Sequence, residues 1–139
     1  KGKIDCLNVE KGYFVDIKTT KSDIDSMVWI QDEASGRNIQ VRWFEAWGYV
    51  LQMAAYKKML EEKYGKEFTP IIYAVTKEPT PDTRAIVFQT QEKLGYELTE
   101  LSMLIKRLDK VKRGEEKAKP CGHCEYCKTK ALSQRVEVV

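Results

Sequence analysis

The sequence predicts an α/β domain in which a β-sheet is flanked by helices. Two observations predict this class. Short runs rich in β-branched and aromatic residues are separated by turn residues, and two longer segments repeat their apolar residues every three or four positions. With 139 residues, 42% of them hydrophobic, the chain can bury the core of one domain and is too short for a second domain of ordinary size.

The first twenty residues predict a β-hairpin. Runs of strand-forming residues lie on both sides of Gly12, which adopts a positive φ at little cost in a turn. A four-residue loop that ends at Gly12 pairs Asn8 with Tyr13. Counting back from that pair places Asp5 opposite Asp16.

The two faces of this hairpin differ in character. Side chains alternate along a strand, so Asp16 and Lys18 share one face of the second strand. The other face is apolar and we expect it to pack against the core. It comprises Ile4, Cys6, Val15 and Ile17.

The middle of the chain predicts a loop region followed by a long helix. Residues 21–39 are polar apart from an apolar patch at 27–30, which is typical of either a short helix or a segment that covers the sheet. Within this region, residues 35–38 predict a loop. From 41 to 64 the apolar residues have helical spacing, and Gly65 is a typical C-terminal stop.

The second half of the chain predicts a strand pair and another helix. The strands, at 69–76 and 84–89, are separated by prolines that prevent a continuous ladder. An amphipathic helix follows from 92 to 112. We therefore expect one core domain over residues 1–114 and a basic, cysteine-containing tail over 115–139.

Two opposed aspartates predict a metal site. They repel each other unless a cation lies between them, and oxygen ligands favour Mg²⁺ or Mn²⁺. Such an ion can polarise a phosphoryl oxygen and activate a bound water. With Lys18 near enough to stabilise developing negative charge, Asp5 and Asp16 have the chemistry that phosphodiester hydrolysis needs. An Asp16–Lys18 ion pair on a solvated hairpin face is the alternative.

A second polar pair lies on the first predicted helix. Gln52 and Tyr56 are one turn apart and so share a helix face. A glutamine among apolar residues needs a polar partner, which favours a position beside the hairpin. A surface glutamine with a tyrosine at the rim of the core is the alternative.

Three motifs occur in a characteristic order: G-K-I-D at 2–5, V-D-I-K-T at 15–19 and Q-M-A-A-Y at 52–56. Together they resemble the motifs of the PD-(D/E)XK nuclease superfamily, and most of all those of its RecB-like and phage RecE-like exonucleases. The resemblance implies a restriction-endonuclease-like fold, a mixed β-sheet flanked by helices, and metal-dependent cleavage of DNA. Many members also carry an acidic or histidine residue on a helix that would precede the start of this chain.

The resemblance assigns roles to individual residues. The implied catalytic residues are Asp5, Asp16, Lys18, Gln52 and Tyr56. The implied ligands of Mg²⁺ or Mn²⁺ are Asp5, Asp16 and the backbone carbonyl of Ile17.

Three cysteines near the C-terminus form a second candidate metal site. Cys121, Cys124 and Cys127 recur every third residue, and such a cluster is typical of Zn²⁺ or an Fe–S cluster. Either would need a fourth ligand. Cys6 is expected on the apolar side of the hairpin, and His123 is adjacent to Cys124. Free thiols in a basic tail are the alternative.

Charge and hydropathy limit which partners the chain is expected to bind. The net charge of +3 does not by itself indicate nucleic acid, but residues 106–130 alone carry +5. This stretch can bind phosphates or form a solvated helix end and tail. No apolar run is long enough to cross a membrane, and the first residues are not those of a signal peptide. We expect a cytoplasmic protein that binds DNA and no membrane.

Taken with the resemblance, these observations favour a Mg²⁺-dependent DNA exonuclease that acts in phage or prophage recombination or repair. Its expected partners are DNA and a recombination protein such as an annealing protein, and its oligomeric state is open. Two alternatives remain at this point. One is a DNA-binding module whose site is catalytically incomplete, and the other is an interaction domain in which metal-binding cysteines carry the function.

Overall fold

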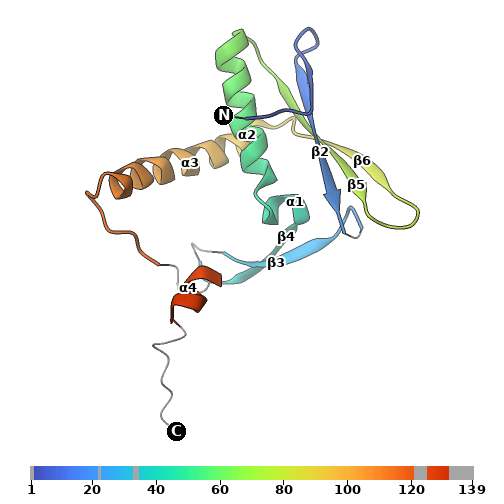
Figure 1. Cartoon of the computed structure of the whole chain (residues 1–139). Coiled ribbons are helices and arrows are strands. Elements are labelled where there is room, and N and C mark those ends of the chain that lie inside the picture. The colour runs from blue at the N-terminus through green and yellow to red at the C-terminus, as the bar shows by residue number, and fades with distance from the viewer. Residues whose placement is uncertain (1, 22, 33–34, 121–124, 132–139) are drawn as a thin grey trace. The chain divides into compact units, whose positions relative to one another are not determined.

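A computed structural model describes residues 2–21, 23–32, 35–120 and 125–131 (Figure 1). The chain forms two compact units, Lys1–Ser102 and Met103–Val139. The first unit contains all the strands and the first two helices. The second contains the end of the third helix and a short fourth helix.

The predicted N-terminal hairpin is present. Strand β1 (Cys6–Asn8) runs antiparallel to β2 (Tyr13–Thr20), and Asn8 pairs with Tyr13 as expected. The Asn8 side chain accepts a hydrogen bond from the Lys11 amide at 2.8 Å. Gly12 has φ 68°, and a Cβ there would lie 2.9 Å from the Glu67 carbonyl oxygen. A glycine is therefore required at this turn both for its backbone angle and for its size.

Four strands form one mixed sheet in the order β1-β2-β5-β6. Strand β5 (Thr69–Thr76) is parallel to β2, and β6 (Thr83–Val87) is antiparallel to β5. The predicted fold class, a mixed sheet flanked by helices, is confirmed. Since parallel strands need a crossover, the chain between β2 and β5 must return to the same end of the sheet. It does so through the longest helix of the first unit.

The predicted helix over 41–64 is wrong at its N-terminal end. The structure has a short helix α1 (Trp43–Ala46) and a separate helix α2 (Tyr49–Tyr64). Gly48 lies between them with φ 67°, a left-handed backbone that an α-helix cannot continue through. The C-terminal stop at Gly65, also left-handed, is where it was predicted.

The segment before α1 is a second hairpin. Strands β3 (Met27–Gln31) and β4 (Asn38–Arg42) pair antiparallel as a separate two-stranded sheet. For this region the sequence was compatible with either a short helix or a segment that covers the sheet. Val28 and Val41 form one of its cross-strand pairs, so the apolar patch serves as a strand.

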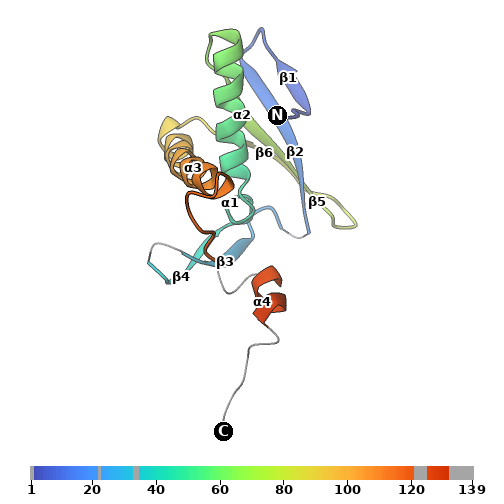
Figure 2. The same ribbon diagram turned by 60° about the vertical axis from the view of Figure 1, so that its left-hand side comes forward.

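Helix α2 lies along one face of the four-stranded sheet (Figure 2). Phe14 of β2 is fully buried on that face, and its ring centroid is 6.4 Å from that of Tyr56 on α2. Lys57, also buried, donates to the carbonyl of Phe68 at 3.0 Å and so connects α2 to the start of β5. The core gathers between the helix and this covered face. Its buried members are Phe14, Ile24, Trp43, Phe44, Val50, Met53, Ala54, Leu60, Phe68, Ile72, Ala74 and Leu94.

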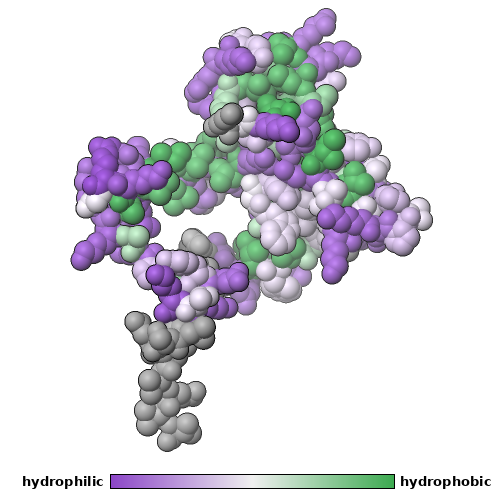
Figure 3. All heavy atoms as spheres, viewed as in Figure 1, coloured by the Kyte–Doolittle hydropathy of each residue, from purple (hydrophilic) through white to green (hydrophobic). Residues whose placement is uncertain are grey.

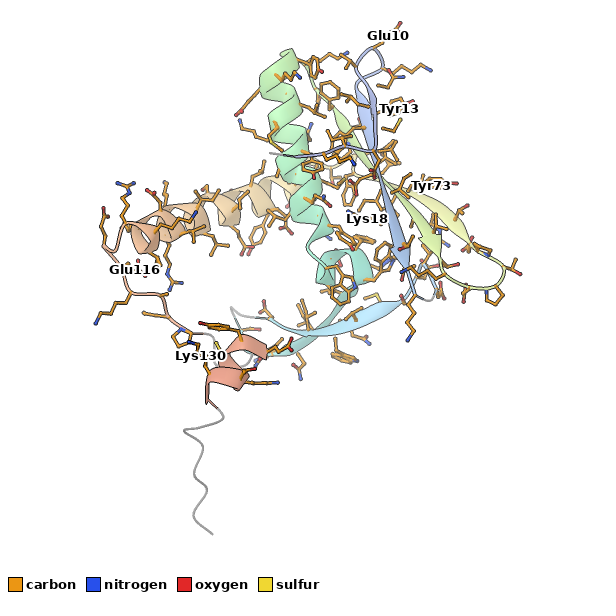
Figure 4. The ribbon with its side chains drawn as sticks, viewed as in Figure 1. Glu10, Tyr13, Lys18, Tyr73, Glu116 and Lys130 are labelled. Atoms are coloured by element: carbon orange, nitrogen blue, oxygen red, sulfur yellow. The ribbon has the colours of Figure 1, made fainter. Side chains whose placement is uncertain are left out.

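The expected apolar packing face of the hairpin is therefore wrong. The helix covers the face of Phe14 and Asp16, and the face that carries Ile17 is open. Ile17 is 54% exposed, Cys6 is also exposed, and Tyr73 on the neighbouring strand is 40% exposed. Figure 4 shows Lys18 and Tyr73 on opposite sides of the sheet. The alternation of side chains was predicted correctly, but it does not say which face a helix will cover.

Helix α3 (Gln91–Lys112) begins in the first unit and continues into the second, which also contains α4 (Glu125–Ala131). Leu94 of α3 is buried, whereas a strip of apolar side chains farther along the helix is exposed (Figure 3). That strip consists of Tyr96, Met103, Leu104, Ile105 and Leu108. Among the described residues, no helix has the length and apolar character to span a membrane.

Candidate active site

A buried aspartate and a lysine form the centre of the site. Asp16 lies on the covered face of β2 and is only 3% exposed. The Lys18 ammonium is 2.6 Å from Asp16 Oδ2. This ion pair compensates the charge of the buried carboxylate. Its oxygens are also of the kind that a divalent cation such as Mg²⁺ takes as ligands.

Lys18 is held from its other side by an aromatic ring. Its Nζ lies 4.3 Å from the centroid of Tyr49, the first residue of α2. A cation over a ring face is attracted to it, so Tyr49 and Asp16 together fix the ammonium. Tyr49 was not among the site residues predicted from the sequence. Its position three residues before Gln52, on the same side of the helix, was the available signal.

Asp5 lies directly before β1 and is connected to the same stretch of β2. Its Oδ2 accepts a hydrogen bond at 2.9 Å from the amide of Ile17, the residue between Asp16 and Lys18. The register Cys6–Val15 places Asp5 next in line opposite Asp16. The structure therefore places Asp5 beside the stretch of β2 that carries Asp16 and Lys18. A role for the Ile17 carbonyl stays a prediction.

Gln52 and Tyr56 interact with each other and with the segment before Asp5. Gln52 Nε2 donates to the Tyr56 hydroxyl at 3.0 Å, and the Lys3 amide lies 3.4 Å from that hydroxyl as a donor. The glutamine thus has the polar partner that its position required. Both side chains belong to the helix that covers the face of Asp16.

Gly2 is a site residue that sequence reasoning did not single out. A Cβ at this position would lie 2.6 Å from Cε1 of Tyr56 and 3.1 Å from Cε of Met59. Such contacts are too close for any side chain, so only glycine lets the backbone pass beside the Tyr56 ring. Gly2 opens the G-K-I-D motif, which was the signal in the sequence.

The donor set fits a hard divalent cation in part. Asp5 and Asp16 supply carboxylate oxygens, and Mg²⁺ is commonly bound by one or two carboxylates with water and substrate phosphates completing its shell. Among the described residues, no group of three or more His, Cys, Asp or Glu side chains gathers at one point.

The second predicted metal site lies mostly outside the described residues. Cys121 and Cys124 fall in the part of the chain that is not described, as does His123. Cys127 lies in α4. Binding of Zn²⁺ or an Fe–S cluster by these cysteines stays a prediction, as does binding of DNA by the basic stretch 106–130.

Comparison with known protein families identifies the family of the chain. Residues 1–130 match the family described as "PDDEXK-like domain of unknown function (DUF3799)". The chain belongs to this family.

A solved structure is also similar to this PDDEXK-like domain. It is a crystal structure described as "Putative exonuclease" from Eubacterium rectale, with 27% sequence identity and a TM-score of 0.72. The match covers 95% of this chain and 46% of the other, so the chain spans about half the length of that protein. No curated protein matches the chain. Family and structure together support a nuclease.

Proposed function

We propose that this domain is a metal-dependent DNA nuclease that hydrolyses phosphodiester bonds as an exonuclease. The observation that carries the proposal is the placement of Asp5, Asp16 and Lys18 on two adjacent chain segments, joined through the Ile17 amide and the Asp16–Lys18 ion pair. Paired carboxylates with a lysine beside them provide the charges that a phosphoryl-transfer site uses.

Asp5 and Asp16 would hold the metal ion. The buried Asp16 carboxylate already pairs with the Lys18 ammonium, and a metal ion would share this carboxylate with the lysine. When bound, Mg²⁺ or Mn²⁺ would neutralise charge on the scissile phosphate and lower the pKa of a bound water. The Ile17 amide fixes the orientation of the Asp5 carboxylate through its hydrogen bond.

Lys18 supplies a fixed positive charge at the site. Its ammonium, held between Asp16 and the Tyr49 ring, can donate hydrogen bonds to a phosphate oxygen or orient the attacking water. Because its position is set before the substrate arrives, little reorganisation is needed in the transition state.

Gln52 and Tyr56 would position the substrate strand. Both are only partly buried, and their side chains are already joined by a hydrogen bond. Amide and hydroxyl groups of this kind commonly contact the sugar–phosphate backbone. We propose a role in phage or prophage recombination or repair, with a partner such as an annealing protein, on the resemblance of the motifs alone.

The test is Mg²⁺-dependent DNA degradation at saturating substrate by the wild type, Asp16→Asn and Lys18→Ala. Each substitution removes charge that stabilises the transition state, so kcat should fall by roughly 10²-fold or more. DNA affinity should change far less, and Asp16→Asn could bind more tightly because a repulsive carboxylate is gone. EDTA should abolish degradation by the wild type.

The matched controls are an aspartate and a lysine that are not members of the proposed site. Asp109→Asn removes an aspartate of α3 that pairs with Arg113, and Lys58→Ala removes an exposed lysine that pairs with Glu62 on α2. Both should degrade DNA at the wild-type rate. Equal rates for all five proteins would contradict the proposed site. DNA binding without degradation under any divalent ion would contradict the nuclease assignment itself.

A further inference from the structure

A pocket of about 430 Å³ opens beside the Asp16–Lys18 pair. Thr19 and Thr20, which follow Lys18 on β2, form one of its walls, and Tyr49 forms another. The Tyr49 ring also contacts the Lys18 ammonium, so this side chain is shared by the pocket and the candidate active site. Its volume is within the range of about 300–1,000 Å³ that is typical of small-ligand sites, so it has room for one nucleotide.

The aromatic side chains at the base of the pocket are held in place by contacts with the core. Trp43 is buried, and its indole N–H donates to the Ile24 carbonyl at 2.9 Å. Its ring packs edge-on against Tyr49, with centroids 5.9 Å apart. Neither ring can move without breaking these contacts, so the floor is preorganised for a ligand.

The rim of the pocket carries an exposed indole. Trp47 lines the pocket and is 69% exposed. It sits at the break between α1 and α2, where the left-handed Gly48 ends the first helix. An indole offers a large flat surface whose exposure to water is unfavourable, and such rings are the surfaces on which unpaired bases stack.

Polar groups of the pocket suit a phosphate. Thr19, Thr20 and Ser26 offer hydroxyl groups, and Lys21 adds an exposed ammonium. These groups contact phosphate oxygens in many protein–DNA interfaces. The pocket thus combines a stacking surface with phosphate donors, as binding of a nucleotide requires.

The nearby carboxylate of Asp25 does not oppose this assignment. It pairs with Arg84 at 2.6 Å and with Arg42 at 3.0 Å. The hydrogen bond from Arg84 is the main reason that the pKa of Asp25 is lowered. Its charge is therefore neutralised by two guanidinium groups and repels an incoming phosphate little.

We propose that this pocket binds an unpaired nucleotide of the substrate strand, with the base stacked on Trp47, and that the preferred substrate is therefore single-stranded DNA. In a duplex both faces of a base are covered by its neighbours, so stacking on a protein ring requires a base that has left the duplex. This inference rests on the proposed nuclease function, because it places the pocketed nucleotide next to the phosphate that Asp16 and Lys18 act on.

The experiment measures DNA binding in EDTA, where no cleavage occurs. Fluorescence anisotropy compares a labelled single-stranded oligothymidylate with a blunt duplex of equal length, for wild type, Trp47→Ala and Trp47→Phe. We expect Trp47→Ala to weaken single-strand affinity by about tenfold, since one stacked base is lost. Trp47→Phe should recover most of this loss, and duplex affinity should stay unchanged in both.

Trp29→Ala is the matched control. Trp29 is 65% exposed, but it lies opposite Gln40 on the β3–β4 hairpin and does not line the pocket. Its removal should leave both affinities at the wild-type value. Equal losses for Trp29→Ala and Trp47→Ala, equal losses on single strand and duplex, or no loss at all would each overturn the proposal.

Two outcomes separate this inference from the proposed function. If the wild type cleaves DNA with Mg²⁺ but Trp47→Ala does not change single-strand affinity, the nuclease function stands and the proposed nucleotide pocket is wrong. If Trp47→Ala specifically loses single-strand affinity but the wild type does not cleave DNA with any divalent ion, the nucleotide pocket stands and the nuclease function is wrong. Folding of each variant is checked by its urea unfolding curve.

Discussion

The two faces of the four-stranded sheet differ in their side chains and in their surroundings. The face that carries Phe14, Asp16 and Ile72 is covered and buried. The opposite face carries Ile17 and Tyr73, both largely exposed. The only charged side chains of β2, Asp16 and Lys18, thus lie on the side where the helix packs.

This difference shows that the charged face of an amphipathic strand can be the buried one. A charged face normally points to water and an apolar face to the core. Here the charged pair is enclosed, which strengthens its interactions because nearby water is reduced. The energetic cost of burying Asp16 is offset by Lys18 and by the ring of Tyr49.

Large-to-small substitutions should separate the two faces most strongly. Phe14→Ala leaves a cavity under α2 and should lower the free energy of unfolding by about 3–5 kcal/mol. Ile17→Thr keeps a β-branched side chain on the open face and should change it by about 0.5 kcal/mol or less. Urea unfolding measures both. Similar losses for the two variants would mean that the open face is covered in the protein.

Gly2→Ala tests the close contact between the N-terminal segment and α2. The added Cβ would meet the Tyr56 ring, so the ring must move and its hydrogen bond with Gln52 is weakened. We expect kcat for DNA degradation to fall by roughly tenfold, since small displacements at a site are costly.

Gly95→Ala is the control for Gly2→Ala, because nothing lies within 4 Å of a Cβ at that position in α3. It should leave kcat unchanged and stabilise the helix by up to about 1 kcal/mol. Full activity of Gly2→Ala would show that the position of Tyr56 does not matter to the reaction.

The smallest expected effect concerns Asp25, which joins Arg84 on the covered face of β6 to Arg42 on β4. Its pKa is lowered from 3.8, chiefly by the hydrogen bond from Arg84. A carboxylate with a lowered folded-state pKa contributes stability above pH 3.8 and loses it as the pH falls further. Asp25→Asn should flatten the decline of the urea midpoint below about pH 4. If Asp25→Asn leaves the decline of the urea midpoint unchanged, other carboxylates cause the loss of stability at low pH.

The features that were predicted correctly from the sequence are those that depend on residues close together along the chain. The Asn8–Tyr13 register follows from loop length, and the strand over 69–76 follows from composition between clear breaks. The grouping of Asp5 with Asp16 and Lys18 needed only that register. These features are local, so they can be read without knowledge of the rest of the fold.

The errors came from features set by tertiary packing. Which face of β2 is buried depends on where α2 docks, and that docking is decided by Phe14, Met53 and other distant residues. Gly48 ends α1 although the apolar spacing continues across it. The roles of Gly2 and Tyr49 depend on contacts with residues far away in the sequence, which a pattern along the chain does not reveal.

The parallel pairing of β2 with β5 has a consequence for the order of folding. The β1–β2 hairpin is local and such hairpins form in about 1–10 μs, so Asp5 and Asp16 can meet early. Strand β5 joins β2 only after β3, β4, α1 and α2 have been traversed, and contacts of this separation slow folding because a long loop must close first. The two aspartates should therefore come together on the hairpin well before α2, with Tyr49 and Tyr56, packs onto the sheet.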